Sequence, residues 1–157
     1  MIRQKTYTVD QAIERLKNYC AYQERCHQEV KNKLKEMGMI PEAIDLIVTT
    51  LIRHDFLNES RFAKIYTRSK FNLKSWGKNR ITSELKKREI SKFNIDVSLK
   101  EISESEYESV FNALAEKRLS QLKETNKYKK RKKLADYLLY RGWESHKVYS
   151  KVKELIV

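Results

Sequence analysis

The side chains with the clearest chemical signal in this sequence are basic, and they gather in two windows. Residues 68–92 contain nine Lys and Arg against two Glu, and residues 123–133 contain seven against one. Together the two windows account for the whole formal net charge of +13. Lys and Arg concentrated in this way bind phosphate groups by displacing the counterions of a polyanion. The sequence therefore predicts surfaces that contact nucleic acid or an acidic groove on a protein, and both partners fit the pattern.

The predicted binding surface takes residues from both windows, and Trp76 and Tyr128 are available to stack on bases. Its basic members are Arg68, Lys70, Lys74, Lys78, Arg80, Lys86, Lys87, Lys127, Lys129, Lys130, Arg131, Lys132 and Lys133. A solvated helix face usually mixes both signs of charge at a spacing of four residues. Because residues 127–133 contain no acid, we favour a binding surface over an ordinary solvated face.

Other reactive residues lack the spacing that catalysis or metal binding requires. Cys20, Cys26 and His27 are metal-ligand types, but the cysteines are too far apart for a zinc motif and a fourth ligand is missing. His54 and Asp55 have no nucleophile at motif spacing, and we expect them to lie in a turn. The three glycines form neither a Walker A loop nor a dinucleotide fingerprint. We therefore expect no enzyme activity, no metal and no cofactor.

The sequence also carries expectations about location. Its first residues lack an apolar segment of signal-peptide length, and no apolar run approaches the roughly 18 residues of a membrane span. Two cysteines are too few for a disulfide framework, so we expect reduced thiols. These features favour a cytoplasmic protein that makes no membrane contact, and we expect a monomer.

The elements that must position the basic residues are helices. Apolar residues recur at three- and four-residue spacing, strand-like alternation is lacking, and three glycines with one proline leave few breaks. Thr8 and Asn58 suit N-cap positions, and Phe62, Tyr66 and Leu73 follow one another at helical spacing behind Asn58. The predicted helices span 9–24, 27–37, 41–53, 59–73, 78–88, 92–102, 105–124, 129–141 and 146–156. The fold class is therefore predicted to be all-α.

The helix predicted at 78–88 should pack inward on one side and present charge on the other. Ile81 and Leu85 form its apolar face. Arg80 and Lys87, seven residues apart, lie together on the opposite side, where we expect both to face outward.

The sequence repeats its apolar pattern. Five aliphatic positions between Val30 and Leu51 recur as aliphatic residues at an offset of 51, and again at a further offset of 53. This correspondence predicts three tandem three-helix repeats, at residues 8–57, 58–103 and 104–157, stacked into an elongated, curved array. It also aligns Glu89 with Gly38 and Gly142, at a helix end that commonly takes a left-handed backbone.

The middle repeat carries the most specific motif, which runs from Arg61-Phe62-Ala63 and Tyr66 to Gly77, Arg80, Ile81, Glu84 and Leu85. This pattern resembles the RecX regulators of the RecA recombinase, and the similarity extends over nearly the whole chain. It departs from the family where Arg88-Glu89-Ile90 replaces the usual Lys-Gly-Ile. The resemblance implies an all-helical modular array in the cytoplasm. It further implies a protein that lies in the groove of the RecA–DNA filament and inhibits RecA ATPase and strand exchange.

Two other functions compete with this implication. A non-specific nucleic-acid-binding protein without a dedicated protein partner would show the same basic windows. A sequence-specific helix-turn-helix would read bases with its third helix, yet residues 92–102 offer few Arg, Asn or Gln at their start. The first alternative therefore stays open, and the second is disfavoured.

Overall fold

The computed structural model describes residues 5–157, and within this range the chain forms nine α-helices and no strand. The all-α prediction is confirmed, and every predicted helix is present with its ends displaced by at most three residues. None of the helices in this range combines the length and apolar character that a membrane span requires. The helices are α1 Val9–Tyr22, α2 His27–Glu36, α3 Pro41–Arg53, α4 Glu59–Lys74, α5 Lys78–Lys87, α6 Lys92–Lys100, α7 Glu104–Gln121, α8 Lys127–Tyr140 and α9 Ser145–Leu155.

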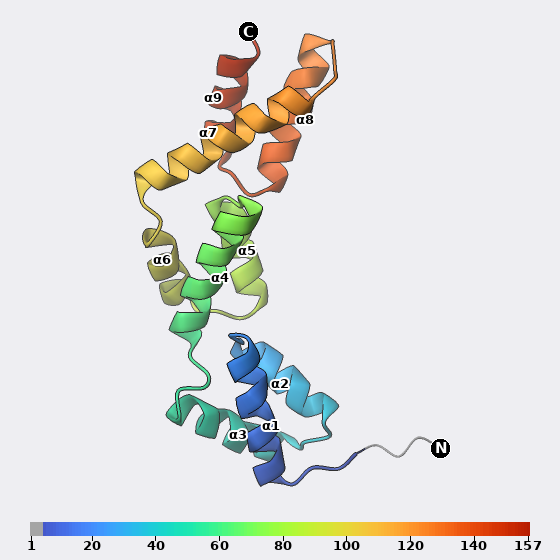
Figure 1. Ribbon diagram of the computed structural model, residues 1–157, viewed down its shortest axis with the longest axis vertical. Coiled ribbons are helices and arrows are strands. Elements are labelled where there is room, and N and C mark those ends of the chain that lie inside the picture. Colours follow the sequence, from blue (N-terminus) through green and yellow to red (C-terminus); the bar gives the residue numbers. More distant parts are fainter. Residues whose placement is uncertain (1–4) are drawn as a thin grey trace, which may run out of the picture.

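The helices form three successive groups along the long axis of the molecule (Figure 1). We call them unit 1 (α1–α3), unit 2 (α4–α6) and unit 3 (α7–α9). The aliphatic positions of the predicted repeat are buried in all three units, except Leu99 and Leu155, which are half-buried. Three-helix repeats therefore build the fold, whereas the unit boundaries 8–57, 58–103 and 104–157 stay predictions.

The turn between the second and third helices has the same backbone geometry in each unit. Gly38 has φ 80°, Glu89 φ 60° and Gly142 φ 91°, so the predicted left-handed conformation at Glu89 is confirmed. The residue after each of these three donates its amide to a carbonyl in the last turn of the preceding helix, as a Schellman motif requires. The pairs are Met39 to Leu34, Ile90 to Leu85 and Trp143 to Leu138, at 3.1, 3.1 and 3.3 Å.

The apolar core is divided unevenly among the units. Unit 1 encloses its own core, which includes Leu16, Ile47 and Leu57. Units 2 and 3 share one continuous core, in which Phe71 and Trp143 are almost fully buried. Unit 1 contributes one described side chain to that shared core, Cys26. Units 2 and 3 therefore form a single packed body, and unit 1 is joined to it at a separate junction.

The inward face of α4 agrees with the spacing at the start of the helix, where Phe62 is buried, and departs from it toward the end. Leu73 was expected at the end of the apolar stripe, but its side chain is 79% exposed. Thr67 and Phe71 are buried in its place, and Thr67 shares a 3.0 Å hydrogen bond with Ser98 of α6. The expectation was wrong because α6 lies on the Thr67 side of α4, which rotates Leu73 into solvent.

Candidate functional site

The junction between units 2 and 3 is built from backbone groups. The Gly77 amide donates to the Arg141 carbonyl at 2.8 Å, and the Asn79 amide to the Gly142 carbonyl at 2.9 Å. The Lys78 amide between them donates to the Tyr107 hydroxyl at 2.9 Å. The amides that open α5 are thus satisfied by groups of unit 3, and the positive end of α5 meets the negative end of α8. This arrangement fixes unit 2 on unit 3.

Arg80 lies in this junction rather than on an outward face. Its guanidinium stacks between the rings of Trp76 and Tyr140, 4.5 and 4.6 Å from their centroids. It also donates to the Tyr140 carbonyl at 3.0 Å. The expectation that Arg80 faces outward beside Lys87 is therefore wrong, because unit 3 covers that side of α5. Lys87 is exposed as expected.

Arg80 belongs to a series of alternating cations and aromatic rings across unit 2, which we call the cation–aromatic row. Its members are Arg88, Tyr66, Lys70, Trp76, Arg80 and Tyr140. Arg88 and Lys70 lie 4.8 and 5.4 Å from the Tyr66 centroid. Lys70 also lies 5.3 Å from the Trp76 centroid. Each such contact contributes about 0.5–1 kcal/mol at an exposed site, so the row holds its cations in a defined order.

Five of the predicted binding cations are engaged in ion pairs. The pairs are Arg68–Glu106, Lys78–Glu104, Lys87–Glu84, Lys132–Asp136 and Lys133–Glu124, at 2.9, 4.0, 3.4, 2.7 and 3.0 Å. The hydrogen bond from Lys133 lowers the pKa of Glu124, and the hydrogen bond to Asp136 raises the pKa of Lys132. Residues 127–133 contain no acid, yet two of their cations are neutralised by carboxylates from outside the segment.

The remaining predicted cations are free of carboxylates or bound to backbone. Arg131 donates to the Ile156 carbonyl at 2.9 Å, as Arg80 does to Tyr140. Six lysines of the predicted binding surface lie outside ion-pair distance of every carboxylate in residues 5–157. They are Lys70, Lys74, Lys86, Lys127, Lys129 and Lys130. These six are the cations best able to meet an external anion.

Three of these lysines stand in the first turn of α8, where their charge is unfavourable. Asn126 caps the helix by accepting the Lys129 amide at 3.0 Å. The first turn then carries Lys127, Lys129 and Lys130 and no acid. A cation at the positive end of a helix is disfavoured by about 0.3–1 kcal/mol. A bound polyanion would relieve this repulsion, which makes the start of α8 the strongest anion-binding candidate.

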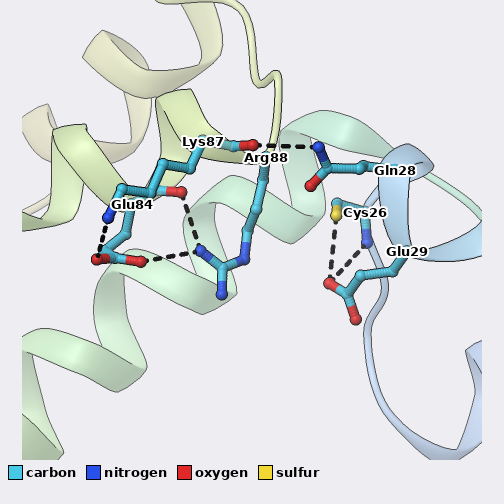
Figure 2. A network of polar contacts seen from close by, with 6 residues as sticks. All are labelled: Cys26, Gln28, Glu29, Glu84, Lys87 and Arg88. Carbon is cyan, nitrogen blue, oxygen red and sulfur yellow. Dashed lines mark hydrogen bonds and ion pairs between the residues drawn. The ribbon is translucent and has the colours of Figure 1, made fainter. Parts of the chain in front are cut away.

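The junction between units 1 and 2 is made mainly by side chains (Figure 2). The Gln28 amide donates to the Lys87 carbonyl at 3.2 Å, and Arg88 is held by the Glu84 carbonyl and carboxylate at 2.9 and 3.3 Å. Partial burial raises the pKa of Glu84, but its hydrogen bonds to Arg88 and Lys87 outweigh burial and lower it overall. Cys26 donates its thiol to Glu29 at 3.2 Å.

A second contact at this junction explains the Arg in the Arg-Phe-Ala motif. The Arg61 guanidinium donates to Glu24 of the α1–α2 turn at 2.9 Å. It also pairs with the Asp55 carboxylate at 3.1 Å and donates to the Asp55 carbonyl at 2.9 Å. Arg61 therefore ties the start of α4 to the α1–α2 turn and to the α3–α4 connection, and a cleft of about 830 Å³ opens beside it.

The residues considered for metal or acid–base chemistry do not form a common site. Cys20 and Cys26 are free buried thiols, and burial raises the pKa of both to about 11. Asp55 lies in a turn with φ 59°, directly after His54. In residues 5–157 no three His, Cys, Asp or Glu side chains are grouped so that they could hold a metal ion.

Sequence reasoning missed Tyr140 and Arg88 as members of this surface. Tyr140 is 73% exposed at the end of α8, and Arg88 is half-buried beside Tyr66. A signal for Tyr140 was its place two residues before Gly142, in the turn that the repeat had aligned. Arg88 stood in the first basic window, at the point where the chain departs from the family's Lys-Gly-Ile.

Comparisons with known proteins agree with this architecture. Family models match residues 58–99 as the second three-helix domain of RecX and residues 106–152 as the third. A crystal structure of RecX from Lactobacillus salivarius superposes with a TM-score of 0.79 at 23% identity, covering 94% of this chain and 96% of that one. Another crystal structure of regulatory protein RecX gives 0.82 at 23% identity, over 93% of this chain and 71% of that one.

Proteins with similar sequences belong to the same family. Regulatory protein RecX of Pelodictyon phaeoclathratiforme is 30% identical over 82% of this chain and 79% of its own length. The RecX of Prosthecochloris aestuarii is 28% identical over 92% and 93%, respectively. The RecX of Clostridium acetobutylicum is 29% identical over 83% of this chain, which spans 62% of that longer relative. The chain therefore belongs to the RecX family of regulatory proteins.

Proposed function

We propose that this protein regulates a RecA recombinase by lying along the RecA–DNA filament and inhibiting its ATPase, recombinase and strand-exchange activities. The observation that carries the proposal is that six lysines of the predicted binding surface, spread over units 2 and 3 of an elongated array, are free of carboxylates (Figure 1). An elongated body with cations on successive units can contact several positions of a helical polyanion at once. Contacts linked in this way raise the overall affinity without strengthening any one of them.

Units 2 and 3 together would act as a semi-rigid rod. Units 2 and 3 share a core and a backbone junction, so their cations keep a fixed separation. A rod bound across neighbouring filament subunits would oppose changes in their arrangement. We further propose that the protein works as a monomer in the cytoplasm, with single- or double-stranded DNA contacted through the basic surfaces.

A RecA ATPase assay on single-stranded DNA, with this protein titrated in, tests the proposal. Inhibition at protein concentrations well below that of RecA supports filament regulation, because one molecule then affects several subunits. Equal inhibition at every DNA concentration would show that the target is the filament rather than free DNA.

The carboxylate-free lysines also suit a non-specific nucleic-acid-binding protein with no dedicated protein partner. That function predicts inhibition only when the protein saturates the DNA, and relief of inhibition by added competitor DNA. Either result in the same assay would contradict filament regulation.

A further inference from the structure

The cleft of about 830 Å³ between units 1 and 2 has two walls of different character. Unit 1 supplies amide and acidic side chains from the α1–α2 turn and the start of α2, including Glu24 and Glu29. Unit 2 supplies Lys70 from α4, and Glu84, Lys87 and Arg88 from α5. The two walls face the same space, so the cleft carries both signs of charge.

The charge of the lining argues against nucleic acid as the occupant. The side chains of Glu24, Glu29 and Glu84 are only 17%, 30% and 20% exposed, and each is in an ion pair, with Arg61, Arg25 and Lys87, respectively. These carboxylates equal the cations of the lining in number, so the cleft has no net positive charge to attract the phosphates of a strand. The start of α8, in contrast, offers three lysines and no acid within its first turn. The two surfaces are therefore built for different partners.

Between the charged walls the cleft has an apolar lining. Phe62 is 4% exposed, Tyr66 is half-buried, and Ile65 remains 48% exposed at the wall. An apolar side chain inserted here would cover Ile65 and the ring of Tyr66. Removing that apolar surface from water would favour binding, against the costs of association.

From this combination we infer that the cleft is the protein-binding site, and that its occupant is a protein segment carrying an apolar side chain between an acidic and a basic residue. The acidic residue would face Lys70, the cation of the lining that has no carboxylate partner, and the basic residue would share Glu24 and Glu29 with Arg61 and Arg25. The inference rests on the proposed function, in which the partner is the protein component of the filament, while nucleic acid is met by the lysines of units 2 and 3 outside the cleft.

Two substitutions that occupy the cleft test this assignment. Ser69→Tyr places a ring inside it, and Ile65→Arg places a charge on its apolar wall. Asn72→Tyr is the matched control, since Asn72 is exposed on the same helix and does not line the cleft. Each variant is titrated against RecA filaments on single-stranded DNA with a non-hydrolysable nucleotide, and separately against the naked oligonucleotide. Circular dichroism establishes which variants are folded.

We expect Ser69→Tyr and Ile65→Arg to weaken filament binding by about tenfold or more, as buried contacts at interface centres do. Their binding to the naked oligonucleotide should stay within about twofold of wild type, and Asn72→Tyr should match wild type in both assays. If both folded cleft variants bind filaments normally, the inference is overturned although the proposed function stands. An equal loss on naked DNA would make the cleft a nucleic-acid site. If the wild type itself fails to bind filaments, the proposed function and this inference fall together.

Discussion

Gly77 and Gly142 meet backbone to backbone across the junction of units 2 and 3. A β-carbon added at Gly77 would lie 2.5 Å from the Gly142 carbonyl oxygen, and one added at Gly142 would overlap the backbone of Arg80. Both residues therefore have to be glycine if the amides of α5 are to reach the carbonyls at the end of α8. This contact gives a physical reason for the glycine at position 77 of the family motif.

The close approach at Gly142 predicts a large cost for Gly142→Ala. Gly38 has a similar backbone, φ 80° against 91°, but nothing lies within 4 Å of a β-carbon placed there. Gly38→Ala should therefore lose only the backbone preference, about 1–2 kcal/mol. Gly142→Ala should lose about 1–3 kcal/mol more, because the added methyl overlaps Arg80. Urea denaturation followed by circular dichroism compares the two, and equal losses would contradict the close approach.

The left-handed backbone at Glu89 predicts a stabilising substitution. Glu89→Gly should raise the free energy of unfolding by up to about 1 kcal/mol, since glycine adopts φ 60° without steric cost. Glu89→Lys should help less, because it improves only the charge at the negative end of α5. Denaturation of both variants provides the measurement. A clear destabilisation by glycine would show that the three turns differ in energy although they share one geometry.

Removing the lysines at the start of α8 should weaken DNA binding and at the same time stabilise the helix. Replacing Lys127, Lys129 and Lys130 with Ala should lower the slope of log affinity against log salt by about two to three units on duplex DNA. The same change should stabilise α8, because it removes cations from the positive end of the helix.

The matched control for that prediction is Lys132→Ala with Lys133→Ala. These two cations already pair with Asp136 and Glu124, so the salt slope should change by less than about one unit. Salt-dependent DNA titrations measure both sets. The contrary result is that the two paired lysines change the slope as much as the three at the helix start do. That result would show that the ion pairs break in the complex and do not distinguish binding from non-binding lysines.

The labelling rates of the two thiols should show whether unit 1 can separate from units 2 and 3 without unfolding. Cys20 is buried inside the unit 1 core, whereas Cys26 is buried in the core shared by units 2 and 3. Burial raises the pKa of both to about 11, so their intrinsic reactivity is similar. We expect a maleimide to label Cys26 faster than Cys20, because releasing unit 1 costs less than unfolding it.

Single-cysteine variants, Cys20→Ser and Cys26→Ser, allow each rate to be measured alone. Arg61→Ala should raise the Cys26 rate because it removes the link to Glu24. The Cys20 rate should not rise, because Arg61 is one of the cations that lower the pKa of Cys20. Equal rates for the two thiols in the wild type would indicate that the whole chain opens as one unit.

The local structure of this protein follows from short-range signals in the sequence. Thr8 and Asn58 cap their helices as predicted, with side chains that accept the amides of Gln11 and Arg61. The aligned turns predicted a left-handed Glu89 although the residue is not glycine. Such features depend on hydrogen bonds and steric limits within a few residues, and the repeat supplies the same limits three times. The helices, their caps and the repeated turns could therefore be predicted from the sequence.

The roles of the charged residues were decided only by contacts between distant segments. Arg80 lies between two rings because unit 3 packs on α5, and Lys133 is neutralised because Glu124 folds back beside it. The division into a fused unit 2–3 body and a separately joined unit 1 depends likewise on where Cys26 and Trp143 are buried. The sequence by itself determined which residues are charged and which helix carries them. The tertiary structure decided which charges remain for a partner, because pairing and burial depend on distances that helical spacing does not contain.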